Sequence, residues 1–192
     1  DAALHADDAI TDISLNWLSD RDTSKPFFLM HHFKSPHGNW ENPESTDFLY
    51  ENTYIPEPHT LRTGPVTGSP GTEGLGSSIG KRNLKRNIGM QMRVDQDMEA
   101  EAYETAAYQR YLKKYLRCVR GVDNNIARLI DHLEFTGELD NTIILYTSDQ
   151  GQLTGKHDYY DKRWMYEESL SMPFIVRYPP AIKAGLTSDA MI

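Results

Sequence analysis

A short apolar segment that stops abruptly at polar residues is the feature that most constrains the fold of this chain. Residues 143–148 are apolar and β-prone, and they run directly into Asp149, Gln150 and a glycine. Before them, apolar residues recur at three- and four-residue spacing over 98–135, which predicts one long helix or two. In α/β proteins, ligands bind outside the carboxyl ends of the strands. The sequence therefore predicts a ligand site at Asp149.

The remaining periodic segments extend the same pattern. Residues 5–20 predict an amphipathic helix, and the apolar run 27–33 that follows Pro26 has the length of a core strand. Residues 174–178 predict a further strand, which ends at two prolines. Helices alternating with strands indicate an α/β fold with a largely buried sheet. The apolar face of the first helix is expected to carry Ile10, Ile13, Trp17 and Leu18.

Length, charge and cysteine usage exclude several classes of protein. With 192 residues, the chain is one domain or a large part of one. A net charge of −8 argues against a nucleic-acid-binding protein, which needs a basic patch. No apolar run is long enough to cross a bilayer. The single cysteine, Cys118, excludes an internal disulfide framework and a cysteine-rich zinc site, and it is expected to be a small buried residue.

Residues 38–95 lack periodicity and are dominated by Pro, Gly, Ser, Thr and Asn. An irregular segment this long is uncommon in a compact domain and is usually functional or disordered. It contains a local basic cluster in an otherwise acidic chain. A solvated face is the favoured interpretation of that cluster, with an anion-binding surface as the alternative. The cluster consists of Lys81, Arg82, Lys85 and Arg86.

The residues around the predicted ligand site suggest its chemistry. Asp149 and Gln150 are adjacent oxygen ligands, which suit a hard cation such as Ca²⁺. The cations that follow, at 156–157 and 162–163, suit an oxyanion held beside that metal. A role for Asp149 in a turn or a helix cap is the alternative.

Two blocks of the sequence resemble the type I sulfatases. The first is Lys-Pro-Phe-Phe-Leu at 25–29, running into Lys-Ser-Pro-His at 34–37. The second is Tyr-Thr-Ser-Asp-Gln-Gly at 146–151, continued by Gly-Lys-His at 155–157 and by residues 161–169. The chain looks most like glucosamine-6-sulfatases and bacterial polysaccharide sulfatases. The resemblance implies a three-layer α/β fold of the alkaline phosphatase-like type. Its central sheet would be mixed and mainly parallel, and incomplete at both ends.

The resemblance also implies roles for individual residues. Asp149 and Gln150 match a pair of Ca²⁺ ligands, while His37 and Lys162 match catalytic residues that reach the sulfate. A cation, a lysine and a histidine would stabilise the negative charge that develops during sulfate ester cleavage, and His37 could protonate the leaving alcohol. Three further residues are expected to line the substrate pocket, with a surface position as the alternative for the last two: His157, Lys156 and Arg163.

Other family features are missing from the sequence. The family uses a formylglycine nucleophile made from a Cys or Ser in a Cys/Ser-x-Pro/Ala-x-Arg motif, and Cys118 does not fit this motif. A pair of aspartates on an earlier strand is also missing. We therefore expect residues 1–192 to be part of a single catalytic domain, without the nucleophile region and the C-terminal subdomain. The fragment alone is expected to be inactive.

The resulting prediction is a Ca²⁺-assisted sulfuric ester hydrolase that acts on sulfated sugars. A periplasmic or secreted location is implied by the resemblance, and the oligomeric state is left open. Trp40 and Tyr54 are candidates for stacking on a sugar, whereas residues 164–166 are expected in the core. Two alternatives remain open: a phosphodiesterase or phosphonate hydrolase of the same superfamily, and a non-catalytic carbohydrate-binding remnant.

Overall fold

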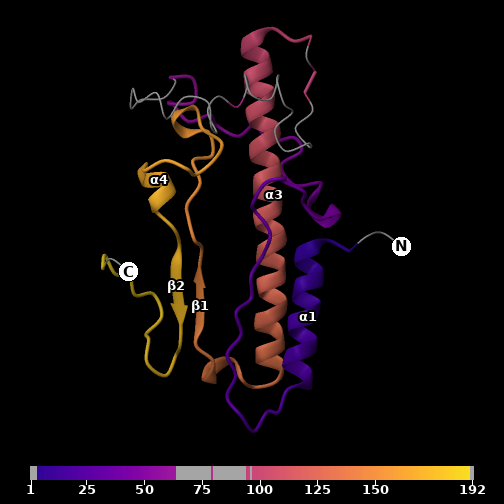
Figure 1. The fold of residues 1–192 in the computed structure, drawn as a ribbon, viewed down its shortest axis with the longest axis vertical. Coiled ribbons are helices and arrows are strands. Elements are labelled where there is room, and N and C mark those ends of the chain that lie inside the picture. The colour runs from indigo at the N-terminus through magenta and orange to yellow at the C-terminus, as the bar shows by residue number, and fades with distance from the viewer. Residues whose placement is uncertain (1–3, 64–78, 80–93, 96, 191–192) are drawn as a thin grey trace.

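The computed structural model describes residues 4–63, 79, 94–95 and 97–190. These residues are arranged around one long helix, α3 (Ala100–Phe135), which is the vertical axis of Figure 1. Helix α1 (Ala6–Asp20) lies along one side of α3, and strands β1 (Ile144–Thr147) and β2 (Phe174–Arg177) lie on the other. Short helical segments complete the described structure: η1 (Glu44–Thr46), η3 (Leu139–Asn141), η4 (Lys156–Asp158) and α4 (Glu167–Leu170).

Helix α3 confirms the prediction for 98–135. It continues through Gly121, where a Cβ atom would lie 2.9 Å from the Cγ of Pro43, so this glycine allows a close packing contact. The helix ends at Phe135, and Gly137 follows with a φ of 73°, which permits a left-handed C-terminal cap. The amide of Glu138 donates to the carbonyl of Leu133 (2.8 Å), which completes the cap. Among the described helices, none combines the length and the apolar character needed to span a membrane.

The hydrophobic core lies along the N-terminal half of α3. Trp40 is only 5% exposed and packs edge-on against Tyr111, with ring centroids 4.8 Å apart. The prediction of Trp40 as a sugar-stacking residue is therefore wrong, because its ring is enclosed by core aromatic residues. Cys118 is buried as predicted, and burial raises the pKa of its thiol to about 11. The other members of this core cluster are Leu61, Ile79, Tyr103, Ala107, Tyr108 and Leu112.

Helix α1 confirms its predicted bounds but buries a different face. The buried residues are Asp7, Thr11, Ser14 and Leu18, whereas Ile13 and Trp17 are 69% and 44% exposed. Leu18 is buried as expected, but the expectation is wrong for Ile13 and Trp17, because much of the buried side of α1 meets polar groups. Ser14 Oγ lies 2.8 Å from Nδ1 of His31, for example.

Polar contacts join α1 to the C-terminal half of α3. Asn125 donates to Asp8 over 2.7 Å, and the guanidinium of Arg128 pairs with Asp12. These partners advance together along both helices, so α1 and α3 run in the same direction. The packing of this helix pair therefore depends on hydrogen bonds and ion pairs that an apolar pattern in the sequence does not reveal.

The segment predicted as a strand at 27–33 is extended but belongs to no β-ladder of the described structure. Its side chains nevertheless alternate as in a strand: His31 is partly buried and His32 is exposed. Burial of His31 against α1 lowers the pKa of its imidazole. Phe28 and Met30, on the outer side, are 83% and 65% exposed. A strand is defined by hydrogen bonds to a neighbour, and the sequence cannot show whether that neighbour is present.

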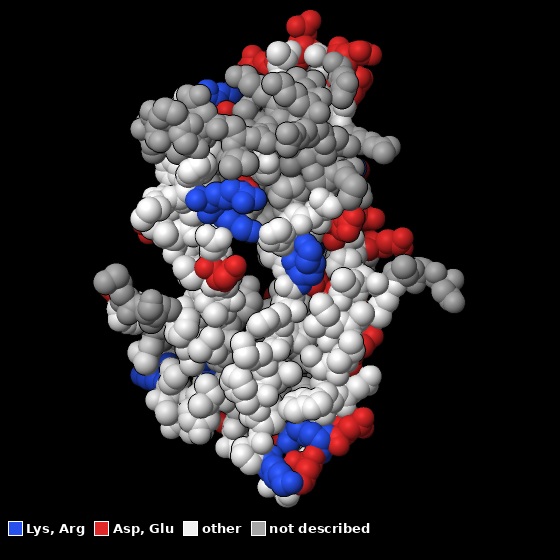
Figure 2. All heavy atoms as spheres, in the orientation of Figure 1, with Lys and Arg blue, Asp and Glu red and all other residues white. Residues whose placement is uncertain are grey.

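Strands β1 and β2 pair antiparallel, with Leu145 opposite Val176 and Tyr146 opposite Ile175. Both strands were predicted, but they are largely exposed rather than buried. Leu145 and Ile175 are 54% and 60% exposed. The expectation of a largely buried sheet is thus not met within the described part of the chain. On the face in Figure 2, the region over the strands is largely free of charged side chains.

Candidate active site

The predicted metal-binding turn lies directly after β1. Its backbone is closed by a hydrogen bond from Ser148 Oγ to the carbonyl of Gln150 (3.0 Å). The side chains of Asp149 and Gln150 are exposed. Strand β1 runs toward α4, so the turn lies at the end of the strand nearest that helix (Figure 1). The location predicted from the sequence, at the carboxyl end of a strand, therefore agrees with the structure.

Helix α4 is held against this turn through Gly151. The amide of Gly151 donates to the carbonyl of Ser169 over 3.0 Å. A Cβ atom at position 151 would overlap the carbonyl oxygens of Glu168 and Ser171. Only glycine allows this approach, which explains why a glycine follows Asp149 and Gln150.

A second segment also contacts α4: the short helix η4, called here the cationic loop because it carries Lys156 and His157. Lys156 and His157 both contact the carboxylate of Glu168: Lys156 Nζ lies 3.1 Å from Oε1, and His157 Nε2 lies 3.5 Å from Oε2. The ring of His157 also stacks on Tyr166, with centroids 4.3 Å apart and planes 13° apart. The structure therefore brings together two of the predicted substrate-binding residues. Sequence analysis did not identify Glu168, although it lies inside the second sulfatase-like block.

Lys162 and Arg163 follow the cationic loop and differ in their contacts. Arg163 Nε donates to Asp161 over 2.6 Å, which ties its guanidinium to a neighbouring carboxylate. The backbone amide of Lys162 donates to the same side chain over 3.0 Å. Within the described residues, no acidic side chain pairs with the ammonium of Lys162, so its charge is available to an anionic ligand. Figure 2 shows blue side chains gathered over α4 and the loop before it.

His37 lies at the end of the extended segment and is exposed. Its Nδ1 lies 2.8 Å from the carbonyl of Gly38, and because a carbonyl oxygen only accepts, Nδ1 is the donor in this contact. Lys34 Nζ donates to the same carbonyl over 3.0 Å. No direct contact joins His37 to the other predicted site residues within the described structure.

Asp7 anchors the segment that leads to His37. Its carboxylate is fully buried and accepts hydrogen bonds from the amides of Lys34 (2.8 Å) and Ser35 (3.3 Å). A residue far from His37 in sequence therefore fixes the backbone next to it. The spacing of Asp7, Thr11 and Ser14 at helical intervals is the signal that could have revealed this polar face.

The residues predicted as metal ligands fit a hard cation only as part of a larger ligand set. Asp149 and Gln150 offer one carboxylate and one amide oxygen, while Ca²⁺ takes about six to eight oxygen ligands. No group of three His, Cys, Asp or Glu side chains suited to a metal occurs among residues that the structure describes. The remaining ligands of such a cation would have to come from other residues of the protein or from water.

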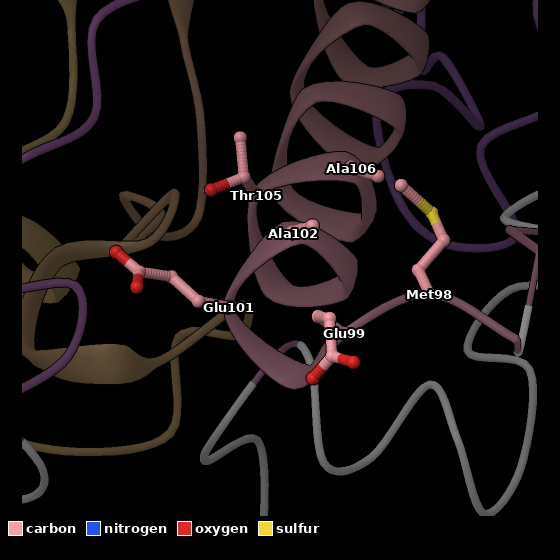
Figure 3. A pocket seen from close by; sticks show the side chains of 6 residues that line it. All are labelled: Met98, Glu99, Glu101, Ala102, Thr105 and Ala106. Atoms are coloured by element: carbon pink, nitrogen blue, oxygen red, sulfur yellow. The ribbon is translucent and has the colours of Figure 1, made fainter.

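A cavity of about 630 Å³ lies at the N-terminus of α3 and is shown in Figure 3. It is lined by Met98, Glu99, Glu101, Ala102, Thr105 and Ala106. None of the predicted site residues lines it, and its two carboxylates would repel an anionic ligand. This cavity is therefore not the candidate active site.

Three other sequence expectations concern the surroundings of the site. Tyr54 is 63% exposed, which leaves it as a candidate for stacking on a sugar. Met165 is 89% exposed, so its expected place in the core is wrong, whereas Tyr166 is partly buried against His157. The basic cluster at 81–86 lies outside the described residues.

Comparison with known proteins identifies the family. The sulfatase family model matches residues 3–191. The chain is 39% identical to an N-acetylglucosamine-6-O-sulfatase from Bacteroides thetaiotaomicron, in an alignment that covers 97% of this chain and 40% of that protein. It is also 28% identical to the human N-acetylglucosamine-6-sulfatase, over 96% of this chain and 30% of the relative. The chain thus spans less than half the length of these relatives.

Solved structures agree with the sequence comparison. A protein whose structure was determined in complex with its substrate D-glucosamine-2-N,6-O-disulfate matches 94% of this chain and 44% of its own, with a TM-score of 0.83 and 35% identity. A phosphonate monoester hydrolase from Silicibacter pomeroyi shares the fold, with a TM-score of 0.61 and 22% identity. These matches confirm the predicted α/β fold of the alkaline phosphatase-like sulfatases. The chain belongs to the sulfatase family.

Proposed function

We propose that the protein containing this chain hydrolyses sulfate esters on sulfated sugars, with 6-sulfated glucosamine units as the first substrates to test. The similarity in sequence and fold to a protein bound to D-glucosamine-2-N,6-O-disulfate carries this proposal. Since the chain spans only 30–44% of the relatives described above, the remaining part of the site is proposed to lie outside these 192 residues. That part would include a formylglycine nucleophile.

Asp149 and Gln150 are proposed to supply oxygen ligands to a Ca²⁺ ion. Both side chains are exposed at the end of β1, and both offer the hard oxygen atoms that this cation prefers. When bound, the cation would supply positive charge next to the oxygens of the sulfate group. A rigid turn, fixed by Gly151 and α4, would hold the two ligands in place.

His37 and Lys162 are proposed to act on the sulfate group. Nδ1 of His37 contacts the Gly38 carbonyl, so Nε2 is the ring nitrogen proposed to act on the substrate. In its protonated form, Nε2 would donate a proton to the leaving oxygen. The ammonium of Lys162 would stabilise negative charge on the sulfate oxygens.

Lys156, His157 and Arg163 are proposed to line the substrate pocket. Each offers hydrogen-bond donors to sulfate and hydroxyl oxygens, and the first two are already held close together by Glu168. A sulfated polysaccharide or its fragments would be the partner. These substrates imply that the protein works outside the cytoplasm, in the periplasm or the medium.

The substitution Asp149→Asn in the intact protein tests the proposed metal role. It keeps the side-chain shape and removes the charge, so Ca²⁺ affinity and sulfate release should both fall, the latter by about 100-fold or more. Calorimetric Ca²⁺ titration and ion chromatography of released sulfate are the measurements. Asp189→Asn, at an exposed position, is the matched control and should leave both unchanged. Full Ca²⁺ affinity in the Asp149 variant would contradict the assignment.

Substrate comparison tests the reaction itself. The intact protein should cleave 6-sulfated glucosamine far faster than a phosphonate or phosphate diester of matched leaving group. Faster phosphonate cleavage would favour the hydrolase class that shares this fold. Sugar binding without hydrolysis of either ester would favour a carbohydrate-binding role.

A further inference from the structure

One acidic residue joins the two parts of the candidate site. Glu168 lies in α4, and its two carboxylate oxygens contact two consecutive basic residues: Oε1 contacts Lys156 (3.1 Å), and Oε2 contacts His157 (3.5 Å). The carbonyl oxygen of the same residue is one of the atoms that exclude a side chain at position 151. Glu168 therefore touches both the cationic loop and the turn that carries Asp149.

The loop that Glu168 holds has an unusual backbone. Thr154, His157 and Asp158 have φ values of 46°, 55° and 62°, a left-handed conformation that costs about 1–2 kcal/mol for each non-glycine residue. Strain of this kind persists only where the surroundings enforce it, and it clusters at functional sites. The amide of His157 donates to Thr60 Oγ1 over 2.9 Å.

Three independent contacts thus fix His157: a hydrogen bond at its backbone, Tyr166 against its ring face, and Glu168 at Nε2. Lys156 is less constrained than His157, because its side chain is half exposed and long enough to sample many rotamers. The carboxylate of Glu168 is the contact that limits this freedom. Burial raises the pKa of the Glu168 carboxyl, but a backbone hydrogen bond and the contact with Lys156 outweigh it, so the pKa is lowered overall.

We propose that Glu168 is a positioning residue, which orients Lys156 and His157 toward a sulfated sugar and couples them to the turn after β1. The inference rests on the proposed function and adds a residue to it. Glu168 itself does not touch the substrate. Glu168 acts through the side chains of Lys156 and His157. Loss of the Glu168 carboxylate should therefore weaken substrate binding more than it slows the chemical step.

Steady-state kinetics of the intact protein tests this inference. Glu168→Gln should raise KM for the sulfated sugar by about tenfold while kcat changes less than about threefold, because ordering of the binding groups is lost. A purely structural defect would lower the amount of active enzyme, and so the apparent kcat, without raising KM. Glu167→Gln, at the exposed neighbouring position, is the matched control and should change neither parameter.

A double substitution shows whether Glu168 acts through its partners. In a Lys156→Met, His157→Ala background, Glu168→Gln should cause little further rise in KM, because residues that act as a unit are not additive. An undiminished tenfold rise in that background would overturn the proposed route. An unchanged KM in the single variant of an active enzyme would overturn the inference itself.

A measurement without turnover separates this inference from the proposed function. The carboxyl pKa of Glu168, followed by NMR, should rise when Lys156→Met removes the paired ammonium. If the protein lacks sulfatase activity but the pKa of Glu168 still rises, the proposed function is refuted while the ion pair between Glu168 and Lys156 is supported. No rise would refute the positioning contact whatever the protein hydrolyses.

Discussion

At the scale of single residues, two side chains with expected chemistry are exposed, and a buried carboxylate holds the backbone next to one of them. Asp149 and His37 lie on the surface, where a ligand can reach them. Asp7, by contrast, is fully buried and holds the amides of Lys34 and Ser35. Burying a carboxylate costs free energy unless hydrogen bonds satisfy it. The two amide donors therefore favour this one position of the segment relative to α1.

The substitution Asp7→Ala is expected to destabilise the chain by about 1–3 kcal/mol, because it leaves two amide groups without their acceptor. Urea unfolding followed by circular dichroism measures this loss. Asp20→Ala, at the exposed last residue of α1, is the matched control and should change stability by less than about 0.5 kcal/mol. Equal unfolding midpoints for the two variants would show that Asp7 does not anchor the segment.

At the scale of elements, the long helix could be predicted from its sequence. Whether the extended segment 27–33 joins a β-ladder could not. The backbone hydrogen bonds of helix α3 join residues about four positions apart, and its apolar spacing and terminal glycine are also local signals. Residues 27–33 show the alternating exposure of a strand, but a ladder needs a partner that local sequence does not specify. The same difference explains why β1 and β2 were found while their antiparallel pairing was not predicted.

Helix α4 is too short to be predicted from periodicity, and its position depends on Gly151. Gly151→Ala is expected to destabilise the chain by about 1–3 kcal/mol, because the new methyl group would displace α4. Hydrogen exchange at the amide of Ser171, which donates to Glu167 in α4, should become faster. Gly185→Ala adds a methyl group where nothing lies within 4 Å, so it should leave exchange in α4 unchanged even though the φ of 78° makes alanine locally strained. Unaltered exchange in the Gly151 variant would contradict this packing.

At the scale of the whole molecule, the aromatic core along α3 supports the irregular segment at 38–63. Trp40 and Tyr54 belong to that segment and were indistinguishable as sugar-stacking candidates in the sequence. The fold separates them, because Trp40 packs against Tyr111 while Tyr54 remains 63% exposed. Only the tertiary packing could decide which ring joins the core.

Trp40→Ala is expected to destabilise the chain by about 3–5 kcal/mol, the usual cost of a large cavity in a core. Tyr54→Ala should change stability by less than about 0.5 kcal/mol and, in the intact protein, act on KM if that ring contacts sugar. Thermal unfolding and sugar-dependent kinetics distinguish the two variants. A small stability loss at Trp40 would contradict its place in the core.

The sequence by itself determined the family, the bounds of the two long helices and the place of the acidic turn after β1. These features depend on local periodicity and on short motifs, which act over a few residues. The tertiary structure alone decided that α1 buries a polar face, that Trp40 belongs to the core, and that Glu168 joins Lys156 and His157. These contacts connect residues distant in the chain, and their free energy depends on geometry that composition and spacing do not encode.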